Sequence, residues 1–266
     1  AYAFIKYKPG KSIFECQFVG LKYFLEIISD SDIWPALRNT LALSFLGLIC
    51  SPLPVIFAIV LSEFRSTKFQ KFIQTTTTFP NFISWIIVYS LAMVVFSVED
   101  GILNKALLSL GLIQTPTNLL VSKDCVYFLQ TGLGIWKGLG FSAIVYFAAI
   151  AGIDTELYDA AAVDGAGRLR TIWHIKVPGI MPTFLVLFLL SIGSILNSGF
   201  DQIYVFYNAL VHERIQTLDM YVYRMGMQNG KFSMSTAVGI FKTIISTILL
   251  VTANLMAKKI TGRSVL

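Results

Sequence analysis

Polar side chains recur at helical spacing inside otherwise apolar segments of this 266-residue chain. In one segment they follow one another in steps of three, three and four positions: Ser191, Ser194, Asn197 and Asp201. These steps predict that the four side chains share one face of a helix. Hydroxyl, amide and carboxylate groups on such a face can hydrogen-bond a hydroxyl-rich solute, which would make them a substrate path. They can equally bond a neighbouring helix, and the sequence leaves both interpretations open.

Two lysines lie inside apolar segments, where a charge costs about 2.5–3.5 kcal/mol on insertion scales. Lys137 shares a helix face with Gln130, and Lys242 shares one with Ser246. Each ammonium group is therefore expected to meet a partner or to face water. The functional interpretation adds Gln130, Lys137 and Lys242 to the substrate path, in contact with an acidic or hydroxyl-rich solute such as a uronate oligomer. The alternatives are an ion pair with a neighbouring subunit or snorkelling to the membrane surface.

Other kinds of chemistry find no support in the residue pattern. No acidic residue lies inside an expected span, which argues against proton coupling through a carboxylate relay. The stretch from Gly226 to Lys231 has a three-residue gap and is followed by Phe232, so it does not match a phosphate-binding loop. The histidines and cysteines have no metal-ligand or disulfide spacing: His174, His212, Cys16, Cys50 and Cys125. We therefore expect no catalytic residues, no metal site and no cofactor bound by this chain.

The composition indicates an integral membrane protein. The chain is 55% hydrophobic and 14% charged, whereas soluble domains carry about 25% charged residues. Five apolar segments are each near the length of about 20 residues that a membrane-spanning helix needs: 38–62, 72–97, 126–150, 178–197 and 235–257. Because helices satisfy their own backbone groups in lipid, we predict an all-α bundle of five transmembrane helices. The net charge of +6 fits basic cytoplasmic loops and needs no nucleic acid as a partner.

The distribution of Lys and Arg gives the orientation in the membrane. Loops 63–71 and 151–177 and the tail with Lys258, Lys259 and Arg263 are basic, so these parts and the C-terminus are expected in the cytoplasm. Residues 98–125, with a short helix over 101–111, and 198–234, with one short helix near 217–226, then lie outside. Residues 1–37 also fall outside, although they carry four lysines. We expect a first helix ahead of them, which makes six spans; the alternative is a tail along the membrane.

A polar stretch at 154–177 interrupts the apolar segments and predicts a short helix followed by a turn. Asp154 or Thr155 can cap a helix that begins at Glu156. Gly165 stands where this helix must stop and reverse, because glycine tolerates left-handed backbone angles. Pro178 has no amide hydrogen and suits the first turn of the next membrane helix.

Within this stretch, Asp159-Ala160-Ala161 is followed by Asp164-Gly165-Ala166 and, nine positions later, by Ile175-Lys176-Val177-Pro178. The pattern resembles the cytoplasmic "EAA" loop of binding-protein-dependent ABC importer permeases. In that family the loop is a short helix, a glycine turn and a second short helix, which docks into a cleft of the ATPase subunit. The resemblance implies an ATPase-docking role for eight residues: Asp159, Ala160, Ala161, Asp164, Gly165, Ala166, Ile175 and Pro178. Asp159 replaces the usual Glu and Val177 the usual Leu, and both changes are conservative.

The resemblance extends along the chain from Arg38. The stretches Phe200–Tyr204, Asp219–Arg224 and Thr236–Lys242 are similar to polysaccharide-type sugar permeases of the same family. In that family the helix after the loop contributes sugar contacts, and the offset from Pro178 puts Ser194 and Asn197 at such positions.

The resemblance implies the fold of a type I ABC importer permease. Residues 38–266 would be its transmembrane domain, with a cytoplasmic coupling loop at 154–177 and an extracytoplasmic loop at 198–234. The chain would form half of a sugar translocation pathway in the bacterial cytoplasmic membrane. Its partners would be a second, different permease, two ATP-binding subunits that hold ATP and Mg²⁺, and an extracytoplasmic solute-binding protein. The alternative functions are a stand-alone ion-coupled carrier or channel, and a structural membrane scaffold.

Overall fold

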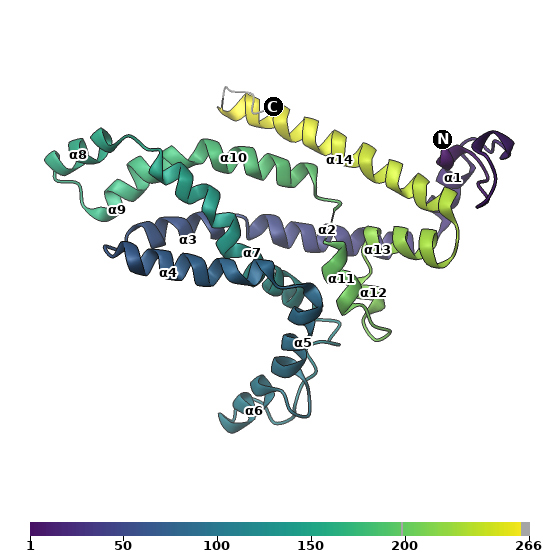
Figure 1. Cartoon of the computed structure of the whole chain (residues 1–266), viewed down its shortest axis with the longest axis horizontal. Coiled ribbons are helices and arrows are strands. Elements are labelled where there is room, and N and C mark those ends of the chain that lie inside the picture. Colours follow the sequence, from purple (N-terminus) through teal and green to yellow (C-terminus); the bar gives the residue numbers. More distant parts are fainter. Residues whose placement is uncertain (198, 262–266) are drawn as a thin grey trace. The chain divides into compact units, whose positions relative to one another are not determined.

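The computed structural model describes residues 1–197 and 199–261, which form helices and connecting turns with one isolated bridge between Ile5 and Phe18 (Figure 1). The all-α prediction is therefore confirmed. The chain divides into two compact units, each assembled from three separate stretches. Unit 1 comprises Ala1–Leu46, Ser84–Thr131 and Ile192–Thr252, and unit 2 comprises Gly47–Ile83, Gly132–Ser191 and the residues from Ala253 onward.

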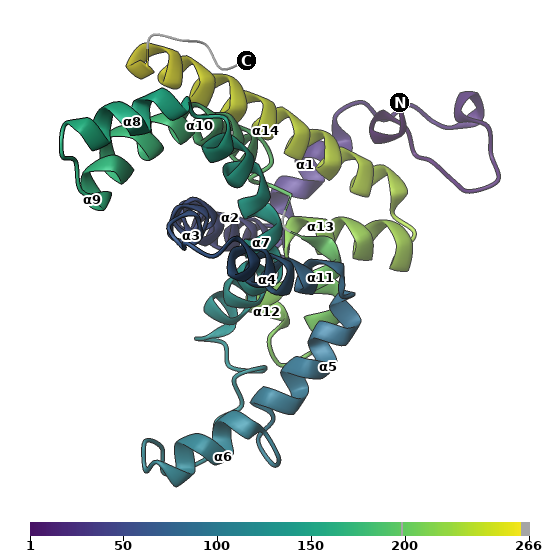
Figure 2. The same cartoon turned by 60° about the vertical axis from the view of Figure 1, so that its left-hand side comes forward.

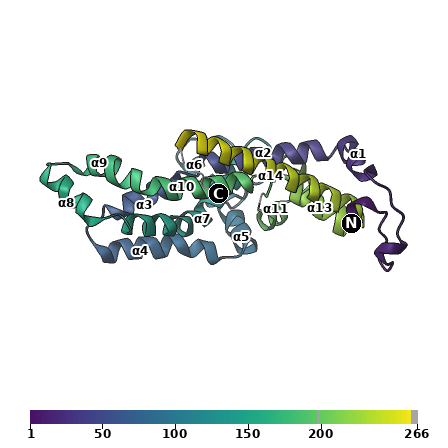
Figure 3. The same cartoon turned by 90° about the horizontal axis from the view of Figure 1, so that it is seen from above.

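Unit 1 contains the N-terminal helices and the helices of the two long loops. Its N-terminal segment is mostly extended, with two short turns ahead of α1 (Figure 3). Its helices are η1 (Tyr2–Phe4), η2 (Ile13–Glu15), α1 (Lys22–Ser29), most of α2 (Ile33–Ile49), α5 (Trp85–Phe96), α6 (Ile102–Ser109), the start of α7 (Val126–Ala151), α11 (Phe200–Phe206), α12 (His212–Ile215), α13 (Leu218–Tyr223), the π-helical turn η5 (Arg224–Gln228) and most of α14 (Phe232–Thr261). Leu196, Leu218, Tyr221 and Val238 are fully buried in its core.

The first 37 residues pack into unit 1 together with parts of the segment 38–266. The Ser233 hydroxyl of α14 donates a hydrogen bond to the Ile5 carbonyl at 2.7 Å and accepts one from the Tyr7 amide at 3.1 Å. Ala3 is completely buried in the unit 1 core. The structural division therefore does not fall at residue 37.

Unit 2 carries the polar loop and the helices around it. These are α3 (Leu53–Ser62), α4 (Thr67–Thr78), η3 (Phe79–Phe82), most of α7, α8 (Thr155–Val163), α9 (Arg168–Thr171), the π-helical turn η4 (Ile172–Lys176) and most of α10 (Val177–Gly193). Its core brings Ala58 and Ile59 of α3 together with Ala143 and Tyr146 of α7 and Ile180 of α10. Ala58 and Ala143 are fully buried in this core.

The apolar helices support the expected number of spans. Four helices of the described residues are long and apolar enough to cross a membrane: Ile33–Ser62, Val126–Ala151, Arg168–Gly193 and Phe232–Lys259. The pair Thr67–Phe82 and Trp85–Phe96 makes a fifth if it is counted as one bent span. The described residues therefore give four spans, or the predicted five when the bent pair is counted as one. A sixth helix ahead of the chain stays a prediction.

Two of the expected spans differ in detail from the structure. The segment 72–97 is broken at Ile83–Ser84, because Pro80 has no amide hydrogen and the Ser84 hydroxyl caps α5 by accepting from the Ile87 amide. The helix that contains the span expected at 178–197 begins at Arg168, within the polar loop, and ends at Gly193. In the long loops, the short helix expected at 101–111 is confirmed as α6. Residues 201–232 are more helical than expected, since α11 and α12 accompany the expected helix near 217–226.

Gly140 of α7 sits against the backbone of α4. A β-carbon at Gly140 would lie 2.3 Å from the carbonyl carbon of Thr77, a distance that real atoms do not reach. Gly138, two residues earlier on the same helix, has nothing within 4 Å of such a β-carbon. The crossing of α4 and α7 in unit 2 therefore requires glycine at position 140 but not at position 138.

We predict that Gly140→Ala lowers the free energy of unfolding by about 1–3 kcal/mol, because an added methyl group must push two backbones apart. Gly138→Ala is the matched control and should leave stability unchanged or slightly raised, since alanine favours a helix. Thermal unfolding of the purified variants in detergent, followed by circular dichroism, measures both. Equal melting temperatures for the two variants would contradict the close crossing.

Candidate functional site

The polar loop folds as a capped hairpin (Figure 2). The Asp154 carboxylate caps α8 by accepting from the Glu156 amide at 3.0 Å, as expected from the sequence. α8 ends in a Schellman motif: Gly165 has φ +66°, its amide donates to Ala162, and the Ala166 amide donates to the Ala161 carbonyl at 2.9 Å. The predicted left-handed turn at Gly165 is therefore present, and it reverses the chain between α8 and α9.

The second arm of the hairpin is continuous with the next membrane span. α9 passes through the π-helical turn η4 into α10. The Val177 amide bonds to the Ile172 carbonyl five residues back, and the following Pro178 has no amide hydrogen to donate. Pro178 lies in the first turn of α10, as expected, and the widened turn before it lets α9, η4 and α10 run on as one longer helix.

The hairpin presents large apolar side chains to its surroundings. Val163 is 88% exposed, Leu169 73% and Trp173 67%. Most of the residues assigned to docking are also exposed: Asp159, Ala160, Asp164, Gly165 and Pro178 are exposed, and Ala161, Ala166 and Ile175 are partly buried. A capped, otherwise polar hairpin with exposed apolar residues has the character of an interaction surface.

Lys176, at the end of η4, was counted in the sequence only as a basic loop residue. Its ammonium group contacts the Glu63 carboxylate and donates to the Ser62 hydroxyl at 2.8 Å. Tyr158 of α8 lies near the same carboxylate. Burial, and then the negative charge of Glu63, raise the pKa of Tyr158, so its phenol stays protonated. Nothing in the local sequence marks the pairing between Lys176 and Glu63.

A second candidate site is a polar cavity of about 260 Å³ in unit 1. It is lined by Gly193, Asn197, Lys242, Thr243, Ser246, Thr247 and Leu250. The residues from α14 recur at steps of three and four, which puts their hydroxyl groups on one helix face. Asn197 and Lys242 of the predicted substrate path meet at this cavity.

The other predicted path residues lie elsewhere. α10 ends at Gly193 and α11 begins at Phe200, after Gly199 with φ +55°, so Ser191, Ser194, Asn197 and Asp201 do not share one helix face as expected. Ser191 donates to the Leu187 carbonyl of its own helix at 2.9 Å, and Asp201 is exposed in the first turn of α11. Gly193 ends α10 and Gly199 precedes α11, and glycine tolerates the backbone conformations at which a helix can stop.

The side chains expected to need partners in the membrane have them. Lys242 contacts the Asp219 carboxylate, and the two side chains are 13% and 23% exposed. Lys137 donates to the Asn81 carbonyl at 2.6 Å. The buried Gln130 accepts from Gln202 at 2.7 Å. An attraction for acidic solutes therefore does not follow from the two lysines alone, because Lys242 already faces a carboxylate.

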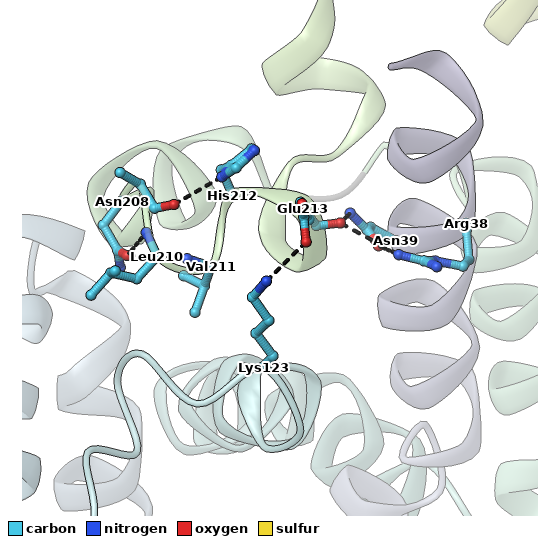
Figure 4. A network of polar contacts seen from close by, with 9 residues as sticks. Arg38, Asn39, Lys123, Asn208, Leu210, Val211, His212 and Glu213 are labelled. Carbon is cyan, nitrogen blue, oxygen red and sulfur yellow. Dashed lines mark hydrogen bonds and ion pairs between the residues drawn. The ribbon is translucent and has the colours of Figure 1, made fainter. Parts of the chain in front are cut away.

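A network of polar contacts holds α12 against α2 and against the loop before α7, which carries Lys123 (Figure 4). The buried Asn39 amide donates to the Glu213 carbonyl at 3.0 Å and to the Gln216 carbonyl at 2.9 Å. Lys123 meets the Glu213 carboxylate at 2.9 Å, and this hydrogen bond and charge lower the pKa of Glu213. The Tyr127 hydroxyl donates to the Asn39 side chain at 2.6 Å. Sequence reasoning missed this network, since its members lie up to 177 positions apart and no local pattern marks them.

Several apolar helices of spanning length, two of them joined by a capped hairpin with exposed apolar side chains, indicate a multi-pass membrane protein with an interaction surface. The chain belongs to the family described as binding-protein-dependent transport system inner membrane components, which it matches over residues 51–262. That family consists of the permease subunits of ABC importers.

Two curated relatives and two solved structures are closely similar to the chain. The polygalacturonan/rhamnogalacturonan transport system permease protein YteP of Bacillus subtilis (strain 168) is 41% identical over 97% of this chain and 80% of its own length. Protein LplB of the same organism is 41% identical over 97% of this chain and 80% of its own length. Crystal structures of a bacterial alginate ABC transporter, one of them with an alginate pentasaccharide-bound periplasmic protein, match with a TM-score of 0.87 and 34% identity, covering 92% of this chain and 85% of theirs.

The family membership establishes the general function. The chain is a permease subunit of a binding-protein-dependent ABC importer and a non-catalytic component of it. The comparisons support this interpretation and not the alternative of a stand-alone ion-coupled carrier or channel.

We predict that Lys242 and Asp219 stabilise the fold as a pair. Asp219→Asn and Lys242→Met should each destabilise the protein, because each leaves a mostly buried charge without its partner. The double variant should lose less than the sum, with an interaction free energy of about 1–3 kcal/mol. A double-mutant cycle on thermal unfolding in detergent measures this. Additive losses would mean that the two charges do not act together.

Proposed function

We propose that this chain is the membrane-spanning subunit of an ATP-driven importer of acidic oligosaccharides, and that it docks an ATPase subunit through the hairpin at 154–177. One observation carries the docking: Val163, Leu169 and Trp173 are exposed on a hairpin whose turn and cap are fixed by Gly165 and Asp154. Apolar side chains held in a fixed arrangement in a polar loop gain free energy when a protein surface covers them.

The occupant of this surface is an ATP-hydrolysing subunit, since an importer subunit that carries no phosphate-binding loop needs its energy from a partner. The exposed Asp159, Asp164 and Gly165 and the partly buried Ala161 would form the rest of the contact. ATP and Mg²⁺ belong to that partner, and this chain binds no cofactor of its own. Two permease subunits would engage two such ATPases, one hairpin to each.

The acidic solute is supported by the relatives. Polygalacturonan is a chain of uronic acid units, and one of the matching structures is a transporter involved in the import of the acidic polysaccharide alginate. Both are hydroxyl-rich polyanions of sugar rings. A chain similar to the permeases of both is expected to move a solute of the same chemical class.

The polar cavity supplies suitable hydrogen-bonding groups. The Thr243 and Thr247 hydroxyls each donate at 2.9 Å to a carbonyl one turn back in α14. Each hydroxyl oxygen therefore keeps lone pairs that can accept a hydrogen bond from a sugar hydroxyl. The Asn197 amide, which lines the same cavity, can donate as well as accept. The arrangement suits a solute whose own hydroxyls do both.

The remaining partners and the orientation follow from the same assignment. A second and different permease subunit would complete the pathway, and an extracytoplasmic solute-binding protein would deliver the saccharide. Lys258 and Lys259, in the last turns of α14, support a cytoplasmic C-terminus by the positive-inside rule. Arg263, which the sequence adds to this basic tail, lies outside the described residues. The assembly would sit in the bacterial cytoplasmic membrane, in contact with lipid.

We predict that Val163→Asp and Gly165→Pro each weaken co-purification with the ATPase subunit by about tenfold or more, because binding surfaces lose most from their central apolar residues. Val163→Asp changes only an exposed side chain. Gly165→Pro removes the left-handed turn, since proline fixes φ near −65°. Affinity purification from detergent-solubilised membranes, with the tag on this chain, measures the association.

Gly167→Ala is the matched control for these two variants. Gly167 has φ −72° and open space around it, so alanine fits there without strain. Unaltered ATPase association in Val163→Asp and Gly165→Pro would rule out the hairpin as the docking surface.

We predict that Thr247→Val raises the half-saturating concentration of an oligogalacturonate by about fivefold, because one hydrogen bond to a solute is worth about 1 kcal/mol. Thr252→Val is the control: it removes a similarly exposed hydroxyl of α14 that does not line the cavity. Uptake into proteoliposomes that contain the complete transporter measures the effect. A neutral oligosaccharide of equal length should be taken up poorly by the unaltered protein, and equal uptake of both would contradict the acidic specificity.

A further inference from the structure

Lys176 is a nearly buried cation at the junction of the hairpin and a membrane span. Its side chain is 9% exposed, and the Glu63 side chain that it contacts is 27% exposed. The ammonium group also donates to the Ser62 hydroxyl at 2.8 Å, and that hydroxyl itself donates to the Ile59 carbonyl at 2.7 Å. A buried lysine is tolerated only when charges and hydrogen bonds compensate it, so this contact set is the condition for Lys176 to occupy its position.

The two partners belong to different membrane spans. Lys176 ends η4, which runs without interruption from the hairpin into α10. Ser62 and Glu63 stand at the C-terminal end of α3, the last part of the span Ile33–Ser62. The end of a helix carries partial negative charge, which favours a lysine at this place. The contact therefore ties the start of one span to the end of another.

Apolar packing alone would hold these helices together but would not fix their register. Ile172, Val177 and Ile180 pack in the same cluster as Ala58 and Ile59 of α3. Such contacts are non-directional, so they do not select one pairing of residues as a hydrogen-bonded ion pair does. An ion pair with an added hydrogen bond is lost when the helices slide by one helical turn of about 5.4 Å. The polar contacts thus determine where along α3 the junction sits.

The hairpin reaches the same point through its first arm. The charge of Glu63 acts on Tyr158 of α8. Glu63 therefore contacts Lys176 of η4 and lies within electrostatic range of Tyr158 of α8. A displacement of the hairpin moves α10 directly, because the helix is continuous. It moves α3 only through contacts of this kind, because no continuous helix joins them.

We infer that Lys176, Glu63 and Ser62 form a clasp whose side chains act as positioning residues: they hold α3 in register with the hairpin, so that motion of the docked hairpin is passed to the span Ile33–Ser62. This inference rests on the proposed docking of the hairpin to an ATPase. It adds that docking and transmission are separable, because the charged clasp side chains are largely buried whereas the docking residues Val163 and Leu169 are exposed.

The test uses the complete transporter with its ATPase and its binding protein, reconstituted in proteoliposomes. Glu63→Gln and Lys176→Met each break the ion pair, and Glu63→Lys combined with Lys176→Glu restores it with the charges exchanged. Ser62→Ala removes one hydrogen bond and keeps the pair. Lys68→Met, at an exposed lysine of α4, is the matched control. Three quantities are measured: ATPase association, the ratio of ATPase activity with and without loaded binding protein, and solute uptake.

If the clasp acts as inferred, each single variant keeps the ATPase bound, while uptake and the stimulation ratio fall by about tenfold. The exchanged pair recovers to within about threefold of the unaltered protein, since the register contact is restored. Ser62→Ala falls between, and Lys68→Met has no effect. A residue that only stabilised the fold would lower the amount of assembled complex and leave the stimulation ratio of the remaining complex unchanged.

Three results would overturn the inference. One is unchanged uptake in both single variants, and another is a loss that the exchanged pair does not relieve while the ATPase remains bound. The third is a fall in the amount of assembled complex with an unchanged stimulation ratio. If the single variants assemble too poorly to be measured, the stimulation ratio of Ser62→Ala decides the question, because this variant keeps the ion pair. Failure of the proposed function is distinguishable, because then the unaltered chain itself does not bind the ATPase.

Discussion

A positive charge inside an apolar helical bundle persists only where the chain supplies a group to meet it, and this constraint accounts for much of the structure. Lys176 meets Glu63, Lys242 meets Asp219, and Lys137 meets the carbonyl of Asn81. Each contact joins two different helical elements. The lysines therefore fix the places where helices are fastened to one another, while apolar residues fill the space between those places.

Local signals in the sequence were reliable because they act within one or two helical turns. The Asp154 cap, the left-handed Gly165 and the short helix after Gly101 all depend on residues within about ten positions of each other. The all-helical fold followed from the length of the apolar segments. Proline was less reliable: Pro80 helps to break a segment expected to be continuous, whereas Pro178 lies in the first turn of α10, as expected, but within a longer helix because a π-helical turn precedes it.

The contacts between distant parts of the chain were beyond the reach of the sequence. A lysine in an apolar segment indicates that it needs a partner, but its spacing does not say which one. Lys176 and Glu63 are 113 positions apart, and Asn39 and Gln216 are 177 apart. The predicted helix face of Ser191, Ser194 and Asn197 failed for a related reason, since tertiary structure decides where α10 ends. Asn197 still lines the cavity beside Lys242, but it does so from the turn that follows the helix.

A transport subunit must convert a push at one loop into movement of several spans, and the chain contains two kinds of connection that can do this. The first is the uninterrupted run from α9 through η4 into α10, which moves as the hairpin moves. The second is the polar contact between helices, which adds directional interactions that are lost when the helices slide. The π-helical turn brings them together: it lets Pro178 remain within the continuous helix, and its last residue, Lys176, makes the polar contact. Continuity and register are thus secured by adjacent residues, at the place where the proposed docking of the hairpin would act on the membrane part of the chain.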